Sequence, residues 1–138
     1  MKMVFDTSAL LKRYLPEAGR DAVLALVQRA DPLVAAPHCK LELHSALARL
    51  VRESSVSASQ LQATHDEIER SFSDVDVQPW TPSLERTAIR ALSVAPLRAM
   101  DALHVAAAVS ARADLFVTAD RRQAAAARAM GLNTEYLE

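Results

Sequence analysis

The sequence contains very few of the residues on which several common binding motifs depend. Only two of its 138 residues are glycine, Gly19 and Gly131, and only one is cysteine, Cys39. Two isolated glycines exclude a Walker phosphate-binding loop and the glycine fingerprint of dinucleotide-binding folds. A single cysteine excludes an internal disulfide framework and a zinc site built from several thiolates, and it fits a cytoplasmic setting best.

Long apolar runs are missing as well. No stretch approaches the 18 or more apolar residues of a membrane span, and Asp6 lies where a signal peptide needs its apolar segment. We therefore expect neither a membrane segment nor a secretory signal. Hydrophobic residues make up 51% of the sequence and charged residues 24%, which at this length predicts one globular domain over residues 1–138.

The charge of the chain is almost balanced. It has 16 basic and 17 acidic residues and a formal net charge of −1. Proteins that coat nucleic acid through bulk charge neutralise many phosphates at once and are usually basic, so this balance argues against that class. A basic rim confined to one site is still compatible with it.

The order of sequence patterns predicts a three-layer α/β/α domain with a central parallel sheet of four to five strands. Short β-branched segments alternate with longer helical patterns, which is typical of such folds. Strands are expected at 3–5, 33–36, 75–77 and 115–118, with a last edge strand at 134–137. Helices are expected at about 9–14, 20–29, 38–52, 57–72, 82–95, 98–111 and 120–130. Two pairs, Ser57 with Gln60 and Asp120 with Gln123, have the spacing of a capping box.

Four carboxylates fall at positions that this fold brings to one edge of the sheet. Asp6 and Asp120 directly follow strands, where each also suits an N-cap. Asp101 begins a helix that is apolar on every side, so its charge needs either the helix dipole or a cation. Glu42 lies at the border of an apolar helical stripe, a position usually occupied by a solvated residue. His104 follows Asp101 by three residues, and we interpret it as a hydrogen-bonded core histidine, because one histidine is a weak metal signal.

Carboxylates gathered at one place raise one another's pKa, and a divalent cation removes this conflict. Hard oxygen ligands suit Mg²⁺ or Mn²⁺. Such an ion activates water and stabilises the charge that develops at phosphorus during a displacement. Phosphodiester hydrolysis is therefore the chemistry that the four acids favour.

Four motifs, in this order along the chain, resemble those of the PIN-domain nucleases, and within them the VapC toxins of bacterial toxin–antitoxin pairs. They are Val4–Leu10 (VFDTSAL), Leu41–Leu43 with Ser45–Leu47 (LEL, SAL), Arg98–Ala106 (RAMDALHVA) and Val117–Arg121 (VTADR). The resemblance covers nearly the whole chain. Four motifs together are far more specific than any one of them.

The resemblance implies a metal-dependent endoribonuclease that uses Mg²⁺ or Mn²⁺, with Asp6, Glu42, Asp101 and Asp120 as its metal ligands. Thr118 and Ser8 match hydroxyl positions near the acidic centre, where they would orient a ligand or a water. The family further implies a homodimer and a cognate antitoxin that blocks the site, often with a basic side chain. Lys40 departs from the pattern, because an apolar residue is expected two positions before Glu42.

Four basic residues lie beside the proposed ligands in the sequence and are candidate RNA contacts: Lys40, Arg98, Arg121 and Arg122. Without the four ligands the chain has 16 basic and 17 − 4 = 13 acidic residues, a balance of +3. One or two divalent ions would offset much or all of the −4 at the centre. The sequence thus favours a small metal-filled site with a basic rim.

Other interpretations explain fewer residues. A receiver-type signalling domain needs paired acids after its first strand and a phosphoacceptor after its third, but Asp6 stands alone and Val77 is followed by Gln78 and Pro79. A PIN-like binding module that has lost activity would not need all four acids. Cys39 is adjacent to His38 and points away from it on a helix, so a buried thiol is the simpler interpretation. Trp80 is interpreted as a packing residue.

Overall fold

The computed structural model describes all 138 residues and contains one sheet of five short strands. The strands are β1 (Met3–Phe5), β2 (Leu33–Ala35), β3 (Val75–Val77), β4 (Leu115–Thr118) and β5 (Thr134–Tyr136). Their order is β3-β2-β1-β4-β5, and every neighbouring pair is parallel. The chain moves outward from β1 to β3 and then crosses to β4, so the topological switch lies between β1 and β4. In such sheets ligands bind beyond the carboxyl ends of the strands at this point.

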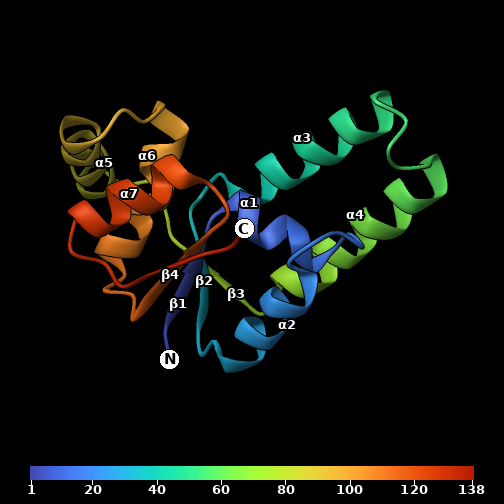
Figure 1. Ribbon diagram of the computed structural model, residues 1–138, viewed down its shortest axis with the longest axis horizontal. Helices are drawn as coiled ribbons and strands as arrows, with labels where there is room; N and C mark the ends of the chain where they lie inside the picture. The colour runs from blue at the N-terminus through green and yellow to red at the C-terminus, as the bar shows by residue number, and fades with distance from the viewer.

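Helices cover both faces of the sheet, which confirms the predicted three-layer fold (Figure 1). They are α1 (Thr7–Leu10), which passes into a 3-10 turn (Leu11–Arg13), then α2 (Arg20–Arg29), α3 (Cys39–Arg52), α4 (Ala58–Phe72), α5 (Pro82–Val94), α6 (Ala99–Ser110) and α7 (Arg121–Ala129). No single helix is both long and apolar enough to cross a membrane; the bent pair α5 and α6 reaches that length and composition only when counted together.

Alternate residues of the central strand build two separate cores. Met3 and Phe5 pack with residues of α1 to α4, whereas Val4 packs with residues of α5 to α7. The division follows from strand geometry, because successive side chains point to opposite faces of a sheet. Since β1 is completely buried, both faces carry apolar residues, as expected for a parallel sheet between helices.

Local signals set most helix ends. Ser57 and Gln60 form the predicted capping box, and Gly131 has a positive φ of 84° just beyond α7. The second predicted capping box is wrong. Asp120 does cap α7, accepting from the Arg122 N–H, but the Gln123 side chain donates to Asp101 instead of returning to the cap.

Helices α3 and α4 form an antiparallel hairpin that extends well beyond the sheet (Figure 1). We call this hairpin, residues 39–72, the arm. Its inner end carries Leu43 and Ile68 into the core beside β1, and its outer end turns at residues 53–57. The first turn of α3, at the base of the arm, therefore lies close to the switch point of the sheet.

Candidate metal centre

The fold brings the four predicted acids to the carboxyl edge of the sheet. Asp6 ends β1 and caps α1, Asp120 follows β4 and caps α7, and Glu42 and Asp101 lie in the first turns of α3 and α6. Three of them line one cleft of about 460 Å³, and Asp6 lies beneath it, in contact with Ser8. The cleft is lined by Thr7, Ser8, Leu11, Lys12, Glu42, Ser45, Ala46, Arg49, Asp101, His104, Ala119, Asp120 and Gln123.

Asp6 is completely buried, and its carboxylate is held by three donors. The Ala9 N–H donates to Oδ1 at 2.9 Å, the Ser8 hydroxyl is 2.8 Å from both oxygens, and the Thr118 hydroxyl donates to Oδ2 at 2.6 Å. Burial raises the pKa of Asp6 above its ordinary value, because these hydrogen bonds and the nearby His104 offset only part of the lost hydration. No lysine or arginine forms an ion pair with it.

The two predicted hydroxyl residues connect Asp6 to the ends of the strands. The Ser8 oxygen accepts the Ala119 N–H at 2.9 Å, and the Thr118 oxygen accepts the Asp120 N–H at 2.9 Å. Each hydroxyl therefore donates its proton to Asp6 and accepts from the backbone that leads to Asp120. The pair fixes the position of one acid relative to the other.

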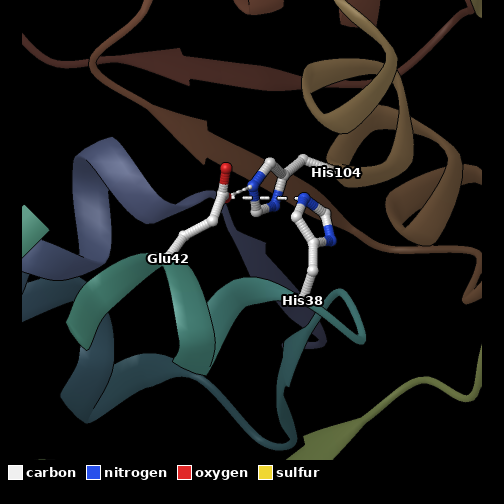
Figure 2. Close-up of side chains that lie close together, drawn as sticks. All are labelled: His38, Glu42 and His104. Atoms are coloured by element: carbon white, nitrogen blue, oxygen red, sulfur yellow. Dashed lines mark hydrogen bonds and ion pairs between the residues drawn. The ribbon is translucent and has the colours of Figure 1, made fainter. Parts of the chain in front are cut away.

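A second hydrogen-bond network converges on one oxygen of Glu42. Thr7 donates to Oε1 at 2.6 Å, His104 Nε2 lies 2.6 Å from the same oxygen, and His38 Nε2 lies 3.4 Å away. Burial raises the pKa of Glu42, but the hydrogen bonds from His104 and Thr7 outweigh it and bring the pKa below its ordinary value. The other oxygen points away from the two histidines and has no hydrogen-bond partner in the protein (Figure 2).

The two histidines hold Glu42 rather than an ion. Their ligand atoms and that of Glu42 lie within 4.8 Å of one another, which is close enough for one metal ion. However, a carboxylate and a carbonyl can only accept, so His104 Nε2 carries a proton toward Glu42 and His38 Nε2 carries one toward the Met100 carbonyl at 2.9 Å. The buried Nδ1 atoms of both rings lack a partner. In this arrangement the imidazoles donate hydrogen bonds and anchor one oxygen of Glu42.

Asp101 and Asp120 form the open side of the centre. Asp101 accepts from the Gln123 amide at 3.2 Å, while Asp120 Oδ1 is occupied by the cap of α7. Burial, followed by the like charge of Asp120, raises the pKa of Asp101. The two carboxylates are thus close enough to oppose each other's ionisation, and neither forms an ion pair with a basic side chain.

Three residues of the centre were not predicted from the sequence, and the partner of a fourth was not. Thr7, His38 and Gln123 were not expected there, although Thr7 belongs to the same motif as Asp6. His104 is buried and hydrogen-bonded as interpreted, but its partner is Glu42, so it belongs to the centre. Its spacing of three residues from Asp101 was the signal that could have placed it.

The basic residues are arranged differently from their order in the sequence. Lys40 lies on the arm, where it pairs with Glu69 at 3.0 Å, and Arg121 donates to the Tyr136 hydroxyl at 3.3 Å. Neither these two nor Arg98 and Arg122 line the cleft; the basic side chains that do line it are Lys12 and Arg49.

The sequence matches the PIN domain family over residues 3–129. The chain belongs to the PIN-domain family. No curated protein sequence matches it significantly.

Several solved structures share the fold at low sequence identity. VapC20 of Mycobacterium tuberculosis, described as a Sarcin-Ricin loop cleaving toxin, is 19% identical with a TM-score of 0.69 and covers 91% of this chain and 95% of its own. FitAcB of Neisseria gonorrhoeae is 15% identical with a TM-score of 0.71, and the match covers 96% of this chain and 95% of FitAcB. VapBC2 of Rickettsia felis, bound to a promoter DNA fragment, is 14% identical with a TM-score of 0.70 and covers 100% of both chains.

The donors of the PIN centre fit a hard divalent cation. Glu42 keeps one oxygen free of protein partners, and Asp101 and Asp120 present carboxylates to the same cleft. Asp6 adds a buried negative charge beneath them that no basic side chain neutralises. Oxygen donors of this kind suit Mg²⁺ or Mn²⁺, which bind through a few carboxylates and retained waters.

Proposed function

We propose that the protein is a Mg²⁺- or Mn²⁺-dependent endoribonuclease that acts as the toxin of a toxin–antitoxin pair. The observation that carries the proposal is the convergence of Glu42, Asp101 and Asp120 on one cleft above Asp6, with no arginine or lysine paired to any of them. Membership of the PIN family and the fold shared with VapC toxins support it.

The roles of the residues follow from their contacts. Asp6, Glu42, Asp101 and Asp120 would hold the ion, which when bound activates water and stabilises charge at the phosphate. Ser8 and Thr118 orient Asp6 through their hydroxyls. Thr7 and His104 hold Oε1 of Glu42, so that the carboxylate stays ionised and presents its free oxygen. Lys12 and Arg49, on the wall of the cleft, are placed to contact the phosphates of RNA.

An antitoxin is the proposed protein partner. The structural neighbours include one protein described as a toxin and one toxin–antitoxin complex, and the cleft here carries more acidic charge than basic charge. An arginine or lysine of the antitoxin would pair with Asp101 or Asp120 and exclude the metal. Co-expression of the adjoining small gene should relieve growth arrest, whereas arrest that persists would contradict the toxin role.

A homodimer is supported by apolar side chains on α5, on α6 and in the segment just before α5. Trp80, Ile89, Leu92 and Met100 are 40–58% exposed around a hollow of about 270 Å³. Contiguous apolar surface of this kind marks protein contacts, and a second copy is the proposed occupant. Sedimentation should give a dimer for the wild type and a monomer for Ile89→Glu, with Gln62→Glu on the arm as the control.

The nuclease proposal is tested by cleavage of RNA. The purified protein should cut RNA with Mg²⁺ or Mn²⁺, and EDTA or Asp101→Asn should abolish cleavage. Arg128→Gln, which exchanges an exposed residue at the far end of α7, serves as the control variant. Full activity of Asp101→Asn, or activity that is equal in EDTA, would contradict the proposal and favour a PIN-like binding module.

A further inference from the structure

A pair of histidines lies on the arm, outside the acidic cleft. His44 of α3 faces His65 of α4, with ring centroids 4.5 Å apart and ring planes inclined by 29°. Their Nδ1 atoms are 2.5 Å from each other. Neither residue lines the cleft, and the proposed function uses neither of them.

A carboxylate fixes the protonation of one of these rings. Glu69 Oε1 lies 3.3 Å from His44 Nε2, and its other oxygen accepts from Lys40 at 3.0 Å. Since hydrogen bonds from Lys40 and His44 lower the pKa of Glu69, it is ionised at neutral pH and can only accept. His44 Nε2 therefore carries the proton, and the lone pair of a neutral His44 lies on Nδ1, directed at His65 Nδ1.

The Nδ1 atoms of the two histidines converge, and one ring is hydrogen-bonded to a carboxylate through its other nitrogen. Metal-binding histidines have this arrangement. Metal-bound histidines commonly donate their other N–H to a carboxylate, which fixes the tautomer and the ring orientation. Two imidazoles around one tetrahedral ion place their nitrogens about 3.4 Å apart, given metal–nitrogen distances near 2.1 Å. The Nδ1 atoms of His44 and His65 need to separate by less than about 1 Å to reach that distance, and both side chains are only partly buried.

We propose that His44 and His65 form a second metal site that clamps the arm and binds a borderline divalent ion such as Zn²⁺, Ni²⁺ or Cu²⁺. Imidazole nitrogens favour these ions over Mg²⁺, which prefers oxygen. Glu69 orients His44, and water completes the coordination at the exposed surface of the arm. The ion joins α3 to α4. Glu42 lies in the first turn of α3, at the base of the arm. This site shares no residue with the acidic centre.

The test compares Zn²⁺ binding by variants in the presence of excess Mg²⁺. Asp101→Asn, which weakens the acidic centre, should still bind one Zn²⁺ that is lost when His44→Gln and His65→Gln are added. Glu69→Gln should bind 10–100-fold more weakly. Its matched control, Glu67→Gln, makes the same charge change on another face of α4 and should bind as the wild type does.

Two further measurements complete the test. With Cu²⁺, the electron paramagnetic resonance spectrum of Asp101→Asn should show hyperfine coupling to imidazole nitrogen, and His65→Gln alone should reduce it. Zn²⁺ at one hundred times its Kd should shift the unfolding equilibrium about a hundredfold toward the folded protein, but not in the double histidine variant. Circular dichroism without metal verifies that the variants fold. Equal Zn²⁺ stoichiometry with and without the two histidines, or a Cu²⁺ spectrum without coupling to imidazole nitrogen, would overturn the proposal.

Discussion

Replacing Asp6 with asparagine should make the metal-free protein more stable at neutral pH while it abolishes RNA cleavage. Asp6 is 0% exposed and has no basic partner, and burial raises its pKa. In the folded protein the neutral form is thus favoured relative to the unfolded chain, and ionisation of Asp6 costs stability. Asparagine removes that charge, and its side-chain oxygen can still accept the Ala9 N–H.

The raised pKa of Asp6 determines whether the free energy of unfolding rises or falls with pH, and it limits the size of the change per pH unit. Between the unfolded pKa of Asp6, 3.8, and its raised folded pKa, the folded protein binds more protons than the unfolded chain. The free energy of unfolding therefore falls as pH rises through this window, by at most about 1.4 kcal/mol per pH unit for one group. Below pH 3.8 both states are protonated and Asp6 has no effect on stability.

Urea unfolding in EDTA, measured for the wild type and Asp6→Asn from pH 3 to pH 8, isolates this contribution. The difference between the two proteins should be small at pH 3 and should grow with pH in favour of Asp6→Asn. Saturating Mg²⁺ should reduce the difference, because the ion stabilises only the protein that keeps the carboxylate. A wild type that gains stability relative to Asp6→Asn as pH rises in EDTA would refute the reasoning.

Three other changes test the networks around the acids. Thr118→Val removes a donor to Asp6 and the acceptor of a backbone N–H, so it should lower the free energy of unfolding by about 2–4 kcal/mol in urea titrations. His104→Leu removes a donor that lowers the pKa of Glu42, so the acidic limb of the cleavage pH profile should move to higher pH; an unchanged limb would contradict the role assigned to His104. Burial raises the pKa of the Cys39 thiol to about 12, so thiol reagents should react with it only after denaturation.

The elements that could be predicted from the sequence are those with local causes. The strand at 75–77 and the helix at 20–29 have the predicted bounds, because apolar periodicity and flanking breakers define them. The capping box at Ser57 also formed as predicted, since both partners lie within one turn of the same helix. Signals of this kind need only a few neighbouring residues.

Contacts between distant segments could not be predicted in the same way. Gln123 had the spacing to cap its own helix, but the fold places Asp101 within reach of its amide, and this contact between α6 and α7 replaces the local one. Likewise, Lys40 precedes Glu42 by two residues, but its side chain points to Glu69 of α4 and does not line the cleft. Residues two apart on a helix do not face the same side. Sequence neighbours of a ligand are therefore poor guides to the residues around it.

Asp6 and Asp120 occupy positions that also have an ordinary structural explanation, the capping of a helix. Asp6 and Asp120 accept backbone N–H groups as ordinary helix caps, and each cap uses part of a carboxylate whose charge the centre also needs. Capping places both acids at the ends of adjacent parallel strands, where the backbone is rigid and their separation is fixed by the sheet register. Basic side chains do not fully offset the cost of gathering these charges, as the raised pKa values of Asp6 and Asp101 indicate. The proposed cation would offset these charges, so the free energy of unfolding of the wild type should rise with the Mg²⁺ concentration.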